Sequence, residues 1–219
     1  MGNSMLQIIV LAAVAVFLIV KLRSVLGTRE GFEKPPVPMQ PAPAARQSKF
    51  EVIEGGVDQD ILDHAPEGSA SARALSQIKS QERDFTVSEF LRGARGAYEM
   101  ILMAYERGDI SGVRAFLSDE VADSFQGAID QRTSQGLVTK AEFVGLREIA
   151  LHDAEYDATS KTAEVTVRFM GELTAVTKDA SGAVISGSPD EVKRQRDVWS
   201  FARVLGSNDP NWQLVATSD

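Results

Sequence analysis

The sequence of 219 residues contains no cysteine and only two histidines, His64 and His152. The lack of cysteine excludes disulfides, zinc ribbons and thiol catalysis. Two histidines far apart in the sequence argue against a His-based metal site and a Ser-His triad. His152 is interpreted as a surface histidine of a strand, because no acid–base set accompanies it. No phosphate-binding loop, metal-ligand spacing or nucleophile motif is present, so no catalytic residue, metal or cofactor is expected.

Positive charge is scarce outside one short stretch of the chain. The formal net charge is −8, yet residues 21–49 carry six basic and two acidic residues. Residues 50–219 hold the remaining 17 basic and 29 acidic residues. A region this acidic repels nucleic acid, which is therefore not an expected partner.

One long apolar run is present, Met5–Val20, and it is polar only at Gln7. As a helix of about 18 residues it would span roughly 27 Å, slightly less than a hydrocarbon core of about 30 Å. A signal peptide would need preceding positive charge and a small-residue cleavage site. N-myristoylation would need Ser or Thr where Leu6 stands. A buried core helix fits poorly with the basic and Pro-rich sequence that follows, so residues 1–26 are predicted to be a transmembrane anchor.

The charges beside this run predict its orientation. Lys21, Arg23 and Arg29 follow it, whereas only the amino terminus precedes it. The positive-inside rule places the following residues in the cytoplasm, or in the matrix of a mitochondrion. We therefore expect a single-pass protein of the bacterial inner membrane with its N-terminus outside.

Residues 27–84 are predicted to be a Pro-rich, disordered tether with extended spacing. The acidic-apolar clusters beginning at Phe50 and Asp58 either dock locally on the folded domain or bind a partner as linear motifs. Ala72, Leu75 and Ile78 have the spacing of a short amphipathic helix.

The best-defined helix is expected from Phe85 to Gly108. Thr86 and Glu89 form a capping box, in which each side chain accepts a bond from the other residue's backbone N–H. Phe85 and Phe90 form a hydrophobic staple around it. An apolar stripe of helical period follows, and Gly108 is expected to end the helix in the left-handed conformation.

The rest of the chain changes from helical to alternating patterns. A short helix is expected over residues 109–117 and a longer one from Ser118 to about Gln135. Strands are expected over 143–156, 161–176, 197–204 and 212–217, with a loop holding at most one short strand over 179–190. Helices followed by antiparallel strands indicate an α+β domain over residues 85–219, with helices packed on a curved four-stranded antiparallel sheet.

Five motifs in this domain carry a resemblance. They are Phe90-Leu-Arg-Gly-Ala-Arg-Gly-Ala-Tyr, Tyr105-Glu-Arg-Gly-Asp, Leu117-Ser-Asp-Glu-Val-Ala-Asp-Ser-Phe, Val198-Trp-Ser-Phe-Ala-Arg and Asp209-Pro-Asn-Trp-Gln-Leu. Together they resemble the Tim44-like domain family over about residues 85–217. The order of anchor, tether and domain is similar to the alphaproteobacterial membrane-anchored members. The resemblance implies a cone of helices over a sheet, as in nuclear transport factor 2-like proteins. It also implies protein tethering at a membrane, with translocation machinery or a chaperone as the class of partner.

Two sets of side chains are candidate binding residues. The first would line an apolar pocket between helices and sheet and consists of Tyr98, Phe125, Phe169, Trp199, Phe201 and Trp212. The second would form a basic stripe for acidic phospholipid head groups and consists of Arg92, Arg95, Arg107 and Arg114. Gly93 and Gly96 inside the helix are interpreted as sites of close packing rather than of ligand approach.

Two classes of function follow. The first is a non-enzymatic, membrane-anchored adaptor that binds protein, and lipid in addition, at the cytoplasmic face of the inner membrane. The second is a small-molecule binder or enzyme that uses an apolar cavity. The apolar face of the strand from Ala163 to Ala175 carries no ionisable residue, which favours the adaptor.

Overall fold

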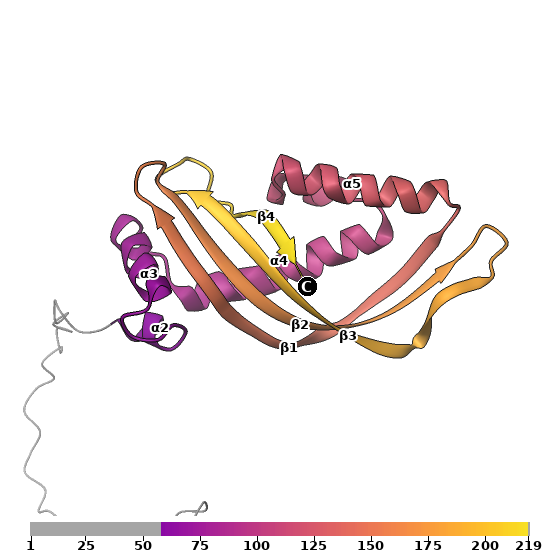
Figure 1. Ribbon diagram of the computed structural model, residues 1–219, viewed down its shortest axis with the longest axis horizontal. Helices are drawn as coiled ribbons and strands as arrows, with labels where there is room; N and C mark the ends of the chain where they lie inside the picture. The colour runs from indigo at the N-terminus through magenta and orange to yellow at the C-terminus, as the bar shows by residue number, and fades with distance from the viewer. Residues whose placement is uncertain (1–57, 219) are drawn as a thin grey trace, which may run out of the picture. The chain divides into compact units, whose positions relative to one another are not determined.

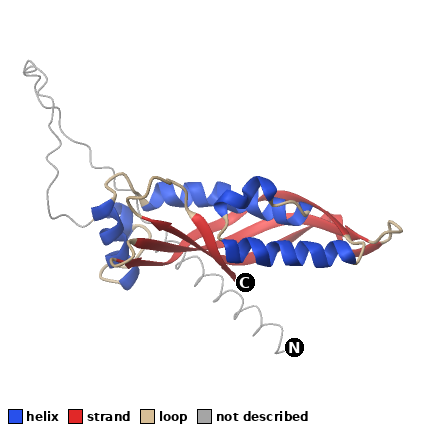
Figure 2. Ribbon diagram, turned by 90° about the horizontal axis from the view of Figure 1, so that it is seen from above, coloured by secondary structure: helices blue, strands red, loops and turns tan. Residues whose placement is uncertain are grey.

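The computed structural model describes residues 58–218, which form helices packed on one antiparallel sheet. The sheet has the strand order β1-β2-β3-β4, with β1 (Val138–Asp157), β2 (Thr162–Lys178), β3 (Val184–Val204) and β4 (Gln213–Ser218). The preceding elements are α2 (Gln59–Leu62), α3 (Ala70–Gln81), α4 (Val87–Arg107), the 3₁₀ helix η1 (Ser111–Phe116) and α5 (Asp119–Ser134). The sheet is curved and α4 lies along its concave side (Figure 1), with the helices layered over the strands in the turned view (Figure 2). The expected α+β fold with a four-stranded antiparallel sheet is confirmed.

Helix α4 begins and ends as its sequence predicts. The side chain of Thr86 accepts a hydrogen bond from the backbone N–H of Glu89 at 3.1 Å, and Gly108 has a φ of 78° at the C-cap. The rings of Phe85 and Phe90 lie 6.1 Å apart, as a hydrophobic staple requires. One half of the capping box differs from the prediction, because the Glu89 carboxylate pairs with Arg92 on the exposed surface.

The alternating pattern of β2 separates the two faces of the sheet. Val165, Val167 and Phe169 are fully buried beneath the helices, while Thr166 and Arg168 between them face the other side. β2 pairs along its whole length with both β1 and β3, so it forms the centre of the sheet. This strand therefore provides the floor on which α4 packs.

Strand β3 is longer than the sequence predicts, because it starts at Val184 rather than at Asp197. The Asp179 side chain accepts hydrogen bonds from the backbone of Ser181 at 2.9 Å and of Ala183 at 3.0 Å, which makes a tight turn after β2. Pairing resumes at once, interrupted by an irregularity after Gly187, whose φ is 77°. A Cβ at Gly187 would lie 2.1 Å from the carbonyl oxygen of Ala175, so this strand position needs glycine.

The folded unit also starts earlier than the predicted boundary at Phe85. Ile61 in α2 and Leu75 and Ile78 in α3 belong to the same hydrophobic core as α4, and Leu75 and Ile78 have no exposed surface. α3 packs against β1. The amphipathic spacing in this region therefore buries apolar side chains against the sheet, and the residues from Asp58 onward are part of the domain rather than of a disordered tether.

The predicted transmembrane anchor, the Pro-rich part of the tether up to Pro43 and the cluster at Phe50 lie outside the described residues. Within residues 58–218, no helix is both long enough and apolar enough to cross a membrane.

Candidate functional site

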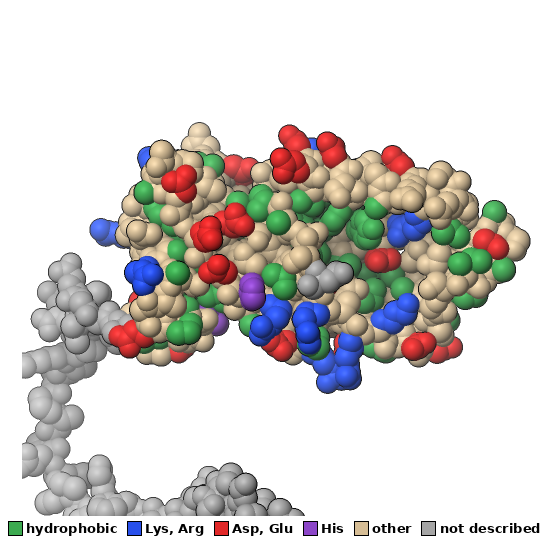
Figure 3. Space-filling model, in the orientation of Figure 1, with side chains coloured by type: hydrophobic (Ala, Val, Ile, Leu, Met, Phe, Trp, Pro, Cys, Tyr) green, Lys and Arg blue, Asp and Glu red, His purple; other side chains and the backbone are tan. Residues whose placement is uncertain are grey.

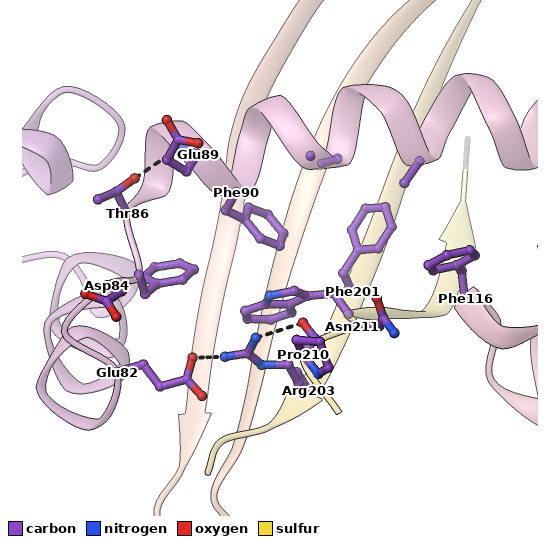
Figure 4. A pocket seen from close by; sticks show the side chains of 15 residues that line it. Glu82, Asp84, Thr86, Glu89, Phe90, Phe116, Phe201, Arg203, Pro210 and Asn211 are labelled. Atoms are coloured by element: carbon purple, nitrogen blue, oxygen red, sulfur yellow. Dashed lines mark hydrogen bonds and ion pairs between the residues drawn. The ribbon is translucent and has the colours of Figure 1, made fainter. Parts of the chain in front are cut away.

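A hollow with a mainly apolar lining lies between the first half of α4, the end of β3 and the β3–β4 connection. It has a volume of about 460 Å³, and we call it the α4 groove. Figure 4 shows its side chains converging from α4 and its preceding loop, from η1 and from the β3–β4 connection. Its wall consists of the aromatic residues Phe85, Phe90, Phe116, Phe201 and Trp212.

Aromatic packing fixes the wall of the α4 groove. The ring centroids of Phe90 and Trp212 lie 4.8 Å apart at 66°, and those of Phe85 and Trp212 lie 6.0 Å apart. Phe90 also contacts Phe201 edge to face, at 6.1 Å between centroids. Edge-to-face pairs of this kind stabilise the arrangement beyond the area they bury, so the wall is a pre-formed surface.

Beyond Glu89 and Phe90, the helical side of the α4 groove is formed by the small residues Gly93, Ala94 and Ala97. A Cβ added at Gly93 would meet no atom within 4 Å, and the same holds at Gly96. The interpretation of these glycines as sites of close packing is therefore wrong. Gly93 leaves open space on the groove, whereas Gly96 is exposed beside it and does not line it.

The polar end of the α4 groove is organised by Arg203 at the end of β3. Its guanidinium pairs with Glu82, donates to the carbonyl oxygen of Pro210 at 2.9 Å, and lies 5.3 Å from the ring centroid of Trp212. Burial lowers the pKa of Arg203, although a side chain with so high a pKa stays charged. The Asp84 and Glu89 side chains are exposed at the rim, so the charged lining residues are three carboxylates against one arginine.

A second hollow lies at the other half of α4, and we call it the β3 pocket. It has a volume of about 450 Å³ and is formed by α4, α5, β3 and the end of β4. Figure 3 shows this face hollowed beneath α5, where hydrophobic side chains gather beside charged ones. The lining residues used below are Leu102, Tyr105, Glu106, Phe125, Asp197 and Trp199.

A hydrogen-bonded cluster lies at the inner end of the β3 pocket. The Tyr98 hydroxyl donates to Asp197 Oδ2 at 2.5 Å, and Gln195 Nε2 donates to the same oxygen at 2.8 Å. Among residues 58–218, Asp197 is the only charged residue that is buried, with 9% of its surface exposed. Burial, followed by the nearby Asp197 carboxylate, raises the pKa of Tyr98, so the hydroxyl stays protonated and acts as a donor.

The structure does not gather the six predicted aromatic residues into one pocket. Tyr98 and Phe169 are fully buried and stack at 4.4 Å between centroids. Phe201 and Trp212 line the α4 groove, whereas Phe125 and Trp199 line the β3 pocket. The predicted set therefore marks the core and the two hollows on either side of it.

The four arginines of the predicted lipid stripe are all exposed. Arg92 pairs with Glu89, and Arg114 pairs with Asp119. Arg92, Arg95 and Arg107 lie on α4, whereas Arg114 lies on η1. Their contact with acidic phospholipid stays a prediction.

Sequence reasoning missed Asp60, Glu106, Asp197 and Arg203. No motif identifies them, because each gains its role from a residue far away in the sequence, as Asp197 does from Tyr98. His152 is exposed as expected. Among residues 58–218, no three His, Asp or Glu side chains are placed to hold a metal ion.

Residues 71–219 match the family model described as the Tim44-like domain. Among solved structures, the crystal structure of the intermembrane space region of the chloroplast protein ARC6 is similar at 15% identity and a TM-score of 0.40, covering 58% of this chain and 94% of that one. No curated protein matches the sequence. Since the family match covers more than half of the sequence, the chain belongs to the Tim44-like domain family.

Proposed function

We propose that this chain is a non-enzymatic, membrane-anchored adaptor whose Tim44-like domain binds an apolar segment of a partner protein in the α4 groove. The observation that carries the proposal is the groove itself, in which an aromatic wall that includes Phe90 of α4 continues into the small residues Gly93, Ala94 and Ala97 of the same helix. Small residues on one side let a second backbone approach closely. A helix that places an apolar stripe in the groove fits this shape.

Charge complementarity specifies the partner further. Asp84 is exposed at the rim beside Glu89, whose exposed carboxylate pairs with Arg92, and residues 50–219 carry 12 more acidic than basic residues. Basic side chains beside the apolar stripe of the partner would therefore meet carboxylates, which favours encounter and orientation. Such a segment belongs to a component of a translocation machinery or a chaperone working at the membrane surface.

The proposed location depends on the apolar run Met5–Val20 and on the basic residues that follow it. With this topology the domain lies on the cytoplasmic face of the inner membrane. A reporter that is active only in the periplasm, fused after Asp219, should stay silent. A strong signal from it would reverse the proposed orientation.

Position-specific crosslinking tests the docking site. A photoreactive amino acid at Ala97, inside the α4 groove, should capture one partner in cells, whereas the same group at exposed Glu99 should not. The captured contact should disappear when Gly93→Phe fills the groove. Equal capture from both positions, or capture that survives Gly93→Phe, would rule out the α4 groove as the docking site.

Salt dependence separates the two contributions to binding. Burial of apolar surface contributes about 25 cal/mol per Å² before ordering costs, and salt does not screen it. The rim carboxylates are exposed, so salt weakens their contribution. The affinity of the purified domain–partner pair should therefore fall only modestly at high salt. Complete loss of binding at high salt would show that exposed charge, and not the aromatic wall, holds the partner.

A further inference from the structure

The β3 pocket is separate from the α4 groove and has a different chemistry. It shares none of its lining residues with the groove, and it is formed by the second half of α4, by α5, by a part of β3 that precedes Phe201, and by the end of β4. Its charged lining side chains are two carboxylates, Glu106 and Asp197. The proposed adaptor function makes no use of either.

The carboxylate of Asp197 is buried without a cation. Both of its hydrogen bonds reach Oδ2, and both come from neutral donors, the Tyr98 hydroxyl and the Gln195 amide. Among residues 58–218, no donor reaches Oδ1 and no Lys, Arg or His side chain pairs with Asp197. Asp197 has 9% of its surface exposed, and Oδ1 is not among the buried polar atoms that lack a partner, so this oxygen is open to the pocket and free to accept a further hydrogen bond.

Glu106 in the same pocket is compensated only weakly. The closest pairing is with Arg132 Nη1 at 3.9 Å. Arg132 Nη2 donates instead to the backbone carbonyl oxygens of Tyr105 at 2.8 Å and Glu106 at 3.1 Å. Burial raises the pKa of Glu106, and the charges of Arg132 and Lys193 offset this effect only in part. Arg132, whose guanidinium also lies 5.6 Å from the Tyr105 ring centroid, and Lys193 therefore compensate the charge of Glu106 only in part.

The walls of the β3 pocket are aromatic. The ring centroids of Tyr105 and Phe125 lie 4.8 Å apart, and Trp199 lines the pocket beside Asp197. Aromatic faces attract cations through their quadrupole, most strongly where water is excluded. Leu102 adds an aliphatic surface. Carboxylates and aromatic walls in one pocket are the combination that recognises an ammonium group carried on an apolar body.

We propose that the β3 pocket binds a small organic cation. Its ammonium group donates to the free Oδ1 of Asp197, Glu106 adds a second negative charge, and the apolar body packs against Tyr105, Phe125 and Trp199. The ligand supplies the positive charge that the protein itself does not place beside Asp197. This site is independent of protein docking in the α4 groove.

The probe for this site is benzylammonium, and its uncharged analogue is benzyl alcohol. Both are titrated at pH 7 into the full-length chain in an uncharged maltoside detergent. Binding is followed by calorimetry and located by amide chemical shifts. Benzylammonium should saturate a site at the β3 pocket and bind at least about tenfold more tightly than benzyl alcohol, because a hydrogen bond to a buried charge is involved.

The variants are Glu106→Gln and Asp197→Asn, with Glu99→Gln on the exposed side of α4 as the matched control. Each pocket variant should weaken benzylammonium binding about tenfold, whereas the control should bind as the original chain does. Thermal melts establish that each variant is folded. If Asp197→Asn does not fold, Glu106→Gln and the comparison with benzyl alcohol decide the outcome. Equal affinity for the two probes, unchanged binding by Glu106→Gln, or shifts confined to the α4 groove would each overturn the proposal.

Discussion

The hydroxyl of Tyr98 occupies the space that a side chain at position 171 would need. A Cβ built on Gly171 would lie 2.5 Å from Tyr98 Oη, closer than real Cβ contacts come. Tyr98 is fully buried, and its hydroxyl donates to Asp197 on the neighbouring strand. Gly171, in the middle of β2, therefore leaves room for the Tyr98 side chain of α4 to reach the carboxylate of Asp197 on β3.

Gly171→Ala should destabilise the chain by about 1–3 kcal/mol, because the added methyl group overpacks the core against Tyr98. Tyr98→Phe should also destabilise it, by about 1–3 kcal/mol, because Asp197 loses a donor and stays buried. The two effects should not add, since removal of the hydroxyl also removes the shortest contact of the new methyl group. A double-mutant cycle by chemical denaturation measures this coupling. Strict additivity would show that Gly171 does not make room for the hydroxyl.

The sequence predicts those parts of the fold that depend on local patterns. The start and end of α4 follow from Thr86 and Gly108, which act within one helical turn of their own positions. The buried face of β2 follows from alternation at Val165, Val167 and Phe169. These features need no knowledge of the remaining chain.

The contacts that build the two hollows could not be predicted in this way. Asp197 belongs to the β3 pocket only because α4 brings Tyr98 to it across 99 positions of sequence. The sequence predicts that Phe201 and Trp212 share one pocket with Tyr98, but Phe201 lies further along β3 and Trp212 lies in the connection before β4, where both line the α4 groove. Aromatic residues fill a core and line a groove with the same pattern, so periodicity alone does not distinguish these roles.

The hydrogen bonds of Asp60 show why the predicted start of the domain at Phe85 is wrong. Its carboxylate accepts hydrogen bonds from the backbone N–H groups of Val87 at 2.8 Å and Ser88 at 3.1 Å, the first residues of α4. Lys79 of α3 donates to it at 3.0 Å. A residue of α2 thus satisfies free donors at the start of α4, 27 positions further along the chain. Nothing in the sequence around Asp60 indicates this role.

Asp60→Asn should destabilise the folded chain by about 0.5–2 kcal/mol, the range found for residues that cap helices. Burial alone would raise the pKa of Asp60, but the bonds from Val87, Lys79 and Ser88 outweigh it and lower the pKa from 3.8 to about 2. The stabilisation is therefore complete above the unfolded pKa of 3.8 and is lost as the pH falls toward 2.

The pH dependence of unfolding tests this assignment. The difference in unfolding free energy between the original chain and Asp60→Asn should shrink between about pH 4 and pH 2. Asp63→Asn is the matched control, because the Asp63 carboxylate bonds only to the exposed side chain of Gln59. A difference that stays constant over this pH range would contradict the assigned role of Asp60.

Truncation tests the start of the domain. A chain that begins at Phe85 loses Ile61, Leu75 and Ile78 from the core, and each buried side chain of this size contributes about 1.5–3 kcal/mol. It should therefore melt at a much lower temperature than a chain that begins at Asp58, or fail to fold. Equal melting temperatures for the two chains would restore the boundary at Phe85.

Substitutions at Gly93 and Gly96 in α4 distinguish effects on the stability of the helix from effects on binding in the α4 groove. A Cβ at Gly93 or at Gly96 would meet no atom within 4 Å, and glycine inside a helix costs about 1 kcal/mol relative to alanine. Gly93→Ala and Gly96→Ala should therefore each raise the unfolding free energy, by about 0.5–1 kcal/mol. Both glycines are exposed, so both substitutions should be equally tolerated by the fold.

Larger side chains at the same two positions should differ in function. Gly93 lines the α4 groove and Gly96 does not, so Gly93→Phe should abolish partner capture while Gly96→Phe preserves it. Thermal melts of both variants show whether the helix remains intact. Because the two positions lie on one helix and share the same local backbone, a difference in capture reports on the groove itself. Loss of capture by both variants, with both still folded, would mean that the partner lies across the exposed face of α4 rather than in the α4 groove.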